Sequence, residues 1–100
     1  MIQGVSRTLK EEVSYSGDRV TNLAWEDKAG ELGYAVLQFD EVPDIEIVLI
    51  DRPTEPSWGA GEAAIGCLPG AIGNAVFNAT GARVRSLPMT PVVVKAALPV

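Results

Sequence analysis

The sequence contains no histidine and a single cysteine, Cys67. A zinc site of the usual cysteine and histidine kind is therefore excluded. An iron–sulfur cluster held by this chain alone is excluded too, because such clusters usually take four thiolates. One cysteine cannot form a disulfide within the chain, which agrees with a reducing compartment. We expect no metal ligands here, and any acid–base group must be a carboxylate, a lysine or a tyrosine.

Basic residues and long apolar runs are also scarce. Lys and Arg number 8 against 13 Asp and Glu, which gives a formal net charge of −5. No basic stripe is present, so we expect no nucleic-acid partner. No apolar run approaches the roughly 20 residues that cross a bilayer. We therefore expect no membrane span, and because no signal peptide is visible the sequence favours a cytoplasmic location over export.

Apolar residues are plentiful, at 47% of the chain, although only 6% of residues are aromatic. This composition argues against disorder. A chain of 100 residues makes one domain, or a piece of one, with a modest core. The apolar residues are spread along the chain rather than gathered in one run. This distribution suggests burial against a partner.

Apolar residues at helical spacing predict a first helix over residues 1–13. The residues that carry the period are Ile2, Val5, Leu9 and Val13. This helix begins at once on apolar residues, without a capping residue or a lead-in. We therefore interpret the chain as a segment cut from within a larger protein.

Three stretches that follow predict strands: residues 19–25, 34–39 and 45–51. The third is the strongest prediction, because it is apolar on both faces apart from Glu46. Trp25 and Tyr34 are interpreted as core residues. The order of helix, two or three strands and two helices indicates an α/β (α+β) fold. We expect a small mixed sheet with two to three packed helices, while the strand count and the direction of pairing stay open.

The second half of the chain is organised around residues 56–91, which carry most of its glycines. A main helix is predicted over residues 68–80, with Pro69 in its first turn and Gly81 as the terminating residue. Glycines at 70 and 73 are costly inside a helix, so they favour close packing over cofactor contact. Thr90 is expected to cap a last helix that starts at Pro91 and runs through Leu98.

The candidate functional residue is Glu62, which directly follows Gly59-Ala60-Gly61. Glycines allow a sharp turn and a close approach of the backbone, so the carboxylate is presented at a tight turn. From this motif alone, an exposed turn residue is an equally good interpretation. Cys67 is expected to be a small buried residue, and Trp58 to pack near the site. Arg83 and Arg85 are expected to be solvated or paired, the alternative being contact with a cofactor phosphate.

Three ordered blocks of the sequence resemble the large subunit of the molybdenum hydroxylases. The first is residues 1–9 with Glu11-Glu12, and the second runs from Asp51-Arg52-Pro53 to Gly61-Glu62. The third runs from Asn74 to Gly81 and continues to Pro91. The isoquinoline 1-oxidoreductase beta subunit, a relative of aldehyde oxidase and xanthine dehydrogenase, is the most similar in character. The chain departs from the family at Ala63, where proline is usual, and at positions 66, 67, 70 and 73.

The resemblance implies that residues 1–100 are the C-terminal portion of a molybdopterin-binding domain. It implies that Glu62 is the general base beside the molybdenum, taking a proton from the oxygen that attacks an N-heteroaromatic or aldehyde carbon. Gly61 and Ala60 would lie against the cofactor, and Gln3 lies either near the pterin or at a surface turn. The cofactor would be molybdopterin cytosine dinucleotide.

The partners implied by the resemblance are the remainder of the large subunit and an iron–sulfur subunit. The isolated chain is then expected to bind no molybdenum and to have no hydroxylase activity. A second hypothesis is non-enzymatic: a free-standing α/β module that keeps the family fold and uses its apolar faces to form homo-oligomers or to bind another chain. The buried character of residues 45–50 motivates this second interpretation.

Overall fold

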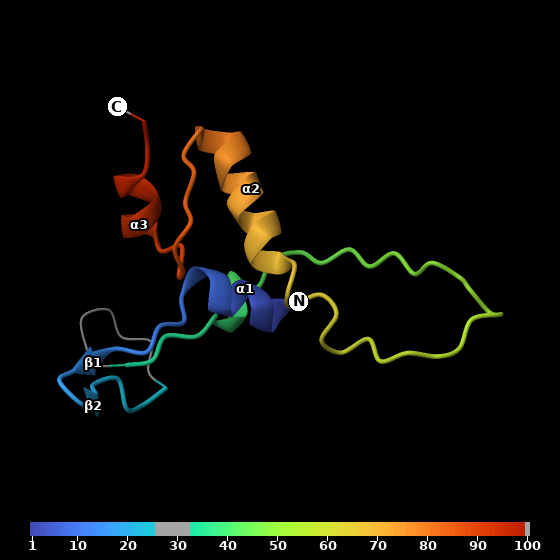
Figure 1. Ribbon diagram of the computed structural model, residues 1–100, viewed down its shortest axis with the longest axis horizontal. Helices are drawn as coiled ribbons and strands as arrows, with labels where there is room; N and C mark the ends of the chain where they lie inside the picture. The colour runs from blue at the N-terminus through green and yellow to red at the C-terminus, as the bar shows by residue number, and fades with distance from the viewer. Residues whose placement is uncertain (26–32, 100) are drawn as a thin grey trace.

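The computed structural model describes residues 1–25 and 33–99. Its elements are three α-helices, one 3-10 helix and a two-stranded antiparallel sheet (Figure 1). In chain order they are α1 (Ile2–Leu9), β1 (Tyr15–Ser16), β2 (Arg19–Val20), η1 (Phe39–Glu41), α2 (Leu68–Thr80) and α3 (Pro91–Ala96). The predicted class, a small α/β unit with up to three helices, is confirmed.

Helix α1 ends at Leu9, four residues before the predicted end. Lys10 leaves the helical conformation with φ −133°, and the side chain of Asn22 then holds the chain in a different course. Its amide donates to the carbonyl of Glu12, and its side-chain oxygen accepts from the N–H of Ser14. The helix therefore ends earlier than the spacing of the apolar residues predicts, because the side chain of Asn22 bonds the backbone of residues 12 and 14.

The buried residues of α1 are small, namely Gly4, Ser6 and Thr8. Thr8 is fully buried, and its hydroxyl donates to the carbonyl of Gly4 at 2.7 Å. The hydroxyl of Ser6 accepts from the N–H of Leu37 at 2.9 Å. The hydroxyl groups of these buried residues are therefore paired inside the fold, as burial requires.

A tight hairpin follows α1. Tyr15 pairs with Val20 and Ser16 with Arg19, and Gly17 adopts a positive φ of 63° at the first turn position. Glycine is favoured there because side chains make that conformation costly. The strand predicted over residues 19–25 is thus shorter than expected, and it continues only as an isolated bridge between Ala24 and Gly33. Trp25, expected in the core, is exposed.

The other two strand predictions are wrong. Residues 34–38 are extended without strand pairing, and η1 begins at Phe39. Residues 45–51, the strongest strand prediction, are also unpaired in the part of the chain that the structure describes. They lie in a long arm, residues 42–67, that leaves the body of the molecule and returns at α2 (Figure 1). A strand needs a neighbouring strand for its hydrogen bonds, and residues 1–25 and 33–99 place none beside residues 45–51.

Helix α2 has the predicted boundaries. Pro69 lies in its first turn, and Gly81 ends it in the left-handed region with φ 74° while its N–H donates to Phe77. Gly73 is buried, and a Cβ built there would lie 3.1 Å from Cε of Met89. The packing interpretation is therefore confirmed for Gly73. Gly70 faces open space, and Cys67, expected to be buried, is exposed.

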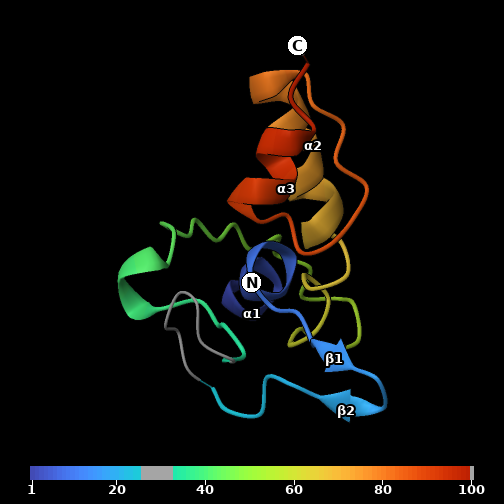
Figure 2. The ribbon, with the colours of Figure 1, turned by 90° about the vertical axis from the view of Figure 1, so that its left-hand side faces the viewer.

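The small core lies where the segment after α2 runs back along that helix (Figures 1 and 2). Its buried apolar residues are Ala82, Val84 and Met89. The N–H of Met89 donates to the carbonyl of Thr8 at 2.7 Å, which ties this segment to α1. Thr90 caps α3 as predicted, accepting from the N–H of Val93, although α3 ends at Ala96 rather than at Leu98.

The molecule is large for its length. Its radius of gyration is 16.7 Å, whereas a globular domain of this size has about 13 Å. Its accessible surface is 8213 Å², against about 5,500 Å² for a compact monomer of the same mass. The arm accounts for this extended shape. No helix in residues 1–25 and 33–99 has the length and apolar character needed to cross a bilayer.

Candidate functional site

Glu62 lies where the arm returns to the body of the molecule. Its side chain is exposed, and its carbonyl accepts from the N–H of Ile65 at 3.1 Å. That bond opens the series of turns over residues 63–67 that leads into α2. The backbone of Glu62 is therefore tied to the start of a helix while its carboxylate stays accessible.

The glycines before Glu62 leave open space around the backbone. A Cβ built on Gly59 or Gly61 would meet no heavy atom within 4 Å, and Ala60 between them is exposed. A bulky group could therefore approach this turn without a steric barrier from the described residues. The same openness means that these residues supply one face of a site and do not enclose it.

Gly4 brings the beginning of α1 to the beginning of α2. A Cβ on Gly4 would lie 2.5 Å from Cδ1 of Leu68 and 3.2 Å from Cγ1 of Ile65, so a larger residue would fit only if these side chains moved. Gln3 precedes Gly4, and Glu62 stands three residues before Ile65. The fold thus brings two predicted site segments, nearly sixty residues apart in the sequence, to the same end of the α1–α2 contact (Figure 1).

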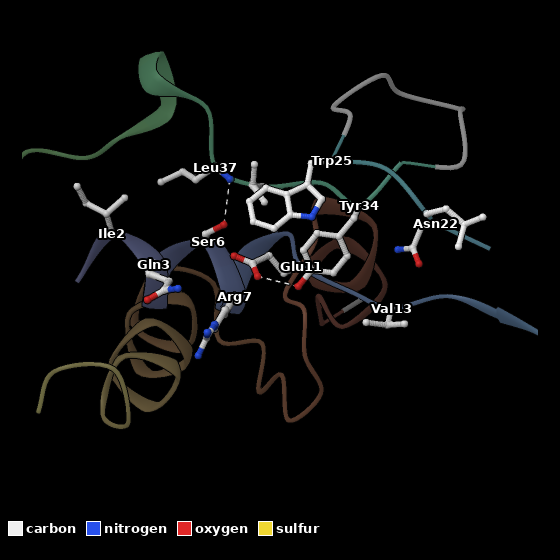
Figure 3. A pocket seen from close by; sticks show the side chains of 12 residues that line it. Ile2, Gln3, Ser6, Arg7, Glu11, Val13, Asn22, Trp25, Tyr34 and Leu37 are labelled. Atoms are coloured by element: carbon white, nitrogen blue, oxygen red, sulfur yellow. Dashed lines mark hydrogen bonds between the residues drawn. The ribbon is translucent and has the colours of Figure 1, made fainter. Parts of the chain in front are cut away.

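Gln3 faces a cavity of about 760 Å³ on the other side of α1 (Figure 3). The cavity lies between α1 and the chain segments around Asn22–Trp25 and Tyr34–Leu37. Its lining includes Gln3 but neither Ala60, Gly61 nor Glu62. The structure therefore does not bring the four predicted site residues into one cavity.

One wall of this cavity is held by a part-buried network that the sequence did not indicate. The hydroxyl of Tyr34 donates to the carboxylate of Glu11 at 2.7 Å (Figure 3). That hydrogen bond, assisted by partial burial, raises the pKa of Tyr34 above its ordinary value. Together with the bond between Ser6 and Leu37, it fastens residues 34–37 to α1.

A second polar link joins the end of α1 to η1. Lys10 pairs with the carboxylate of Glu41, which also accepts from the N–H of Gln38. These two donors hold the pKa of Glu41 below its ordinary value. Both links join residues more than twenty positions apart, a spacing at which no local sequence pattern pairs two side chains.

The other residues singled out in the sequence lie outside these contacts. Arg83 stacks on the ring of Phe77 at 3.7 Å and donates to Asn74 at 2.9 Å. Arg85 is exposed. Trp58, expected to pack near the site, is exposed. Within residues 1–25 and 33–99, no three side chains of the His, Cys, Asp or Glu type are grouped to hold a metal ion.

Comparison with known proteins identifies longer relatives. The chain is 43% identical over 98 residues to a nicotinate dehydrogenase subunit of Pseudomonas putida KT2440, covering 98% of this chain and 8% of that protein. It is 35% identical over 96 residues to the aldehyde oxidoreductase molybdenum-binding subunit PaoC of Escherichia coli K12, covering 90% of this chain and 12% of the relative. The chain therefore spans about a tenth of the length of these two relatives.

A third relative matches a shorter stretch. It is a membrane-bound aldehyde dehydrogenase of Gluconacetobacter polyoxogenes, named for pyrroloquinoline quinone, at 38% identity over 58 residues, or 58% of this chain and 7% of that protein. No family model matches the chain, and no solved structure matches it. The identities to the nicotinate dehydrogenase subunit and to PaoC nevertheless extend over nearly all of the chain. The chain therefore belongs, as a short segment, to the family of molybdenum hydroxylase large subunits.

Proposed function

We propose that this chain is the C-terminal segment of a molybdenum hydroxylase large subunit and that it contributes Glu62 as the general base. The observation that carries the proposal is the position of Glu62. Its carboxylate is exposed on an open glycine turn, and its backbone is held at the start of α2 by the bond to Ile65. A carboxylate held in this way can be enclosed by another part of the subunit without moving the helix behind it.

The residues around Glu62 fit the approach of a large cofactor. We infer that the cofactor is molybdopterin cytosine dinucleotide, which when bound would supply the two-electron oxidation. Gly61 and Ala60 would line its near side, because their small side chains leave the turn open. Gln3 would donate or accept a hydrogen bond through its amide. Glu62 would hold and release the proton of the attacking oxygen.

The substrate class is inferred from the relatives, and the partners are inferred from the family resemblance. Their names specify nicotinate in one case and an aldehyde in the other, so an N-heteroaromatic compound or an aldehyde is the proposed substrate class. The resemblance to isoquinoline 1-oxidoreductase favours the N-heteroaromatic. The proposed partners are the remainder of the large subunit and an iron–sulfur subunit, in the cytoplasm. Since this chain leaves Glu62 exposed, we expect the isolated chain to bind no molybdenum and to turn over no substrate.

The first test is purification of the tagged chain from its native host, with molybdenum and co-purifying polypeptides quantified together. Molybdenum near one per chain, with a larger polypeptide present, supports the proposal. In that complex, Glu62→Gln should lower turnover by at least about 100-fold, the range expected for loss of a general base. Molybdenum content should stay unchanged.

Glu55→Gln is the matched control, because Glu55 is an exposed carboxylate of the same arm. It should leave turnover within about twofold, since surface substitutions away from a site have small effects. Equal losses from both variants would contradict a specific role for Glu62. Hydroxylase activity of the isolated chain would contradict the proposal that it supplies only part of a site.

A second candidate function is a non-catalytic interaction or dimerisation module. It is favoured by the exposed apolar side chains of the arm, including Ile47, Leu49 and Trp58, because exposed apolar surface often marks an interaction site. Sedimentation of the purified chain over a range of concentrations tests it. A stable dimer without molybdenum would support this alternative, whereas a monomer at high concentration would contradict it.

A further inference from the structure

Residues 45–50 of the arm, Ile45-Glu46-Ile47-Val48-Leu49-Ile50, form an exposed apolar segment. Four of them in succession are 69%, 79%, 88% and 82% exposed, from Ile47 to Ile50. Within the described part of the chain, no backbone group of residues 43–51 is hydrogen-bonded to another residue. This apolar arm segment thus leaves both its side chains and its peptide groups to the solvent.

The side-chain pattern shows how this segment would be covered. In an extended chain alternate side chains point to opposite faces, so Ile45, Ile47 and Leu49 share one face. Glu46, Val48 and Ile50 share the other, which is apolar except for Glu46. A strand that is apolar on both faces is typical of the interior of a sheet that is covered on both sides. A surface that covered only one face would leave Val48 and Ile50 in water.

The peptide groups of the segment limit which kind of partner could cover it. Burying these side chains would also remove the neighbouring N–H and C=O groups from water, and buried peptide groups need hydrogen-bond partners. An open edge of a β-sheet supplies such partners in register, whereas a lipid surface supplies none. The partner that fits this segment is therefore a polypeptide with an unpaired edge strand and with apolar side chains that cover both faces of the inserted segment.

We propose that residues 45–50 insert as a strand into a β-sheet of the remaining large subunit. This proposal rests on the proposed function, since it takes the partner to be the polypeptide that makes up about nine tenths of the relatives. Asp44 and Asp51 flank the segment, so basic side chains are expected beside the ends of the receiving strand. Insertion would hold the arm at one end while α2 holds the other, with the Glu62 turn between them.

The test compares the isolated chain with a chimera in which these 100 residues replace the matched segment of the P. putida nicotinate dehydrogenase subunit. Amide hydrogen exchange of residues 45–50 is measured in both proteins. We expect exchange in the chimera to be slower by at least about 100-fold, because strand amides become hydrogen-bonded and buried. Exchange that is equally fast in both proteins would overturn the proposal, even if the chimera keeps hydroxylase activity.

Single aspartates then test the two faces. Val48→Asp and Leu49→Asp place a carboxylate on opposite faces of the segment, and each should lower the yield of soluble chimera by at least about tenfold, because a buried unpaired charge is costly. Thr54→Asp, an exposed arm residue beyond the segment, is the control and should change the yield less than about twofold. An effect at only one of positions 48 and 49 would overturn insertion into a sheet that is covered on both faces.

Two other surfaces could cover the segment, namely a second copy of this chain and a lipid bilayer, and each would give a distinct result with the isolated chain. Protection of residues 45–50 that rises with chain concentration, together with a dimer in sedimentation, would show that a second copy covers the segment. Binding to phosphatidylcholine vesicles that Val48→Asp abolishes would show a lipid surface instead. Either result, together with fast exchange of residues 45–50 in the chimera, would overturn the proposal. The exchange measurement on the unsubstituted chimera decides the case if an aspartate variant fails to fold.

Discussion

Gly4 illustrates at the residue scale how an absent side chain can position a helix. A Cβ at this position would press on Leu68 and Ile65 of the segment that carries Glu62. Gly70 in α2 is the opposite case, because nothing lies within 4 Å of the place where its Cβ would be. Both residues are helical, so comparing them separates the effect of packing from that of helix propensity.

We predict that Gly4→Ala lowers the free energy of unfolding of the isolated chain by about 1–3 kcal/mol, since overpacking at a tight contact costs this much. Gly70→Ala should instead raise it by about 0.5–1 kcal/mol, the advantage of alanine over glycine within a helix. Urea denaturation of both variants measures the difference. A stabilising effect of Gly4→Ala would contradict the close contact between α1 and α2.

The Tyr34–Glu11 bond predicts a pH dependence. The folded state raises the pKa of Tyr34, so the bond stabilises the fold fully below the unfolded value of about 10. This contribution is lost as the pH rises through the higher folded pKa. The difference in unfolding free energy between the wild type and Tyr34→Phe should therefore shrink above about pH 10.

At the scale of the element, α3 is short and depends on its first turn. Thr90 accepts the N–H of Val93, and Pro91 fixes the backbone that follows it. With six residues, the helix has few internal hydrogen bonds to compensate for a lost cap. Helix α2 is different, since its thirteen residues end at a left-handed glycine that satisfies a carbonyl near the end of the helix.

Thr90→Ala should therefore lower the free energy of unfolding by about 0.5–1 kcal/mol, because it removes the side-chain cap. Thr90→Ser retains a hydroxyl that can accept the same bond and should cost less than half as much. Thermal unfolding of the two variants measures the effect. Equal losses from alanine and serine would indicate that the methyl group of Thr90, rather than its oxygen, matters.

At the scale of the whole molecule, the arm and the body should respond differently to a protease. Glu46 and Glu62 lie in the exposed arm, whereas Glu11 is half-buried and bonded to Tyr34. A protease that cuts after glutamate should cleave the arm sites at least about tenfold faster, because cleavage follows local opening. Mass spectrometry of the early fragments identifies the sites. Earlier cleavage after Glu11 would contradict the division into body and arm.

The sequence by itself determined the helices whose signals are local. The boundaries of α2, the glycine that ends it and the Thr90 cap were predicted because their hydrogen bonds join residues only a few positions apart. The pattern of residues 45–51 predicted a buried strand, but the segment is unpaired and exposed in the part of the chain that the structure describes. It could not provide a neighbouring strand, and so the strand prediction was wrong for this chain.

Only the tertiary structure decided which residues meet. It placed Gly4 against the start of α2 and Gln3 in a cavity apart from Glu62, and it joined Tyr34 to Glu11 and Lys10 to Glu41. It also showed that Trp25 and Cys67 are exposed. Burial depends on what the rest of the chain brings alongside a residue, and no local pattern contains that information. In this chain the described residues outside the arm do not cover the apolar side chains of residues 47–50.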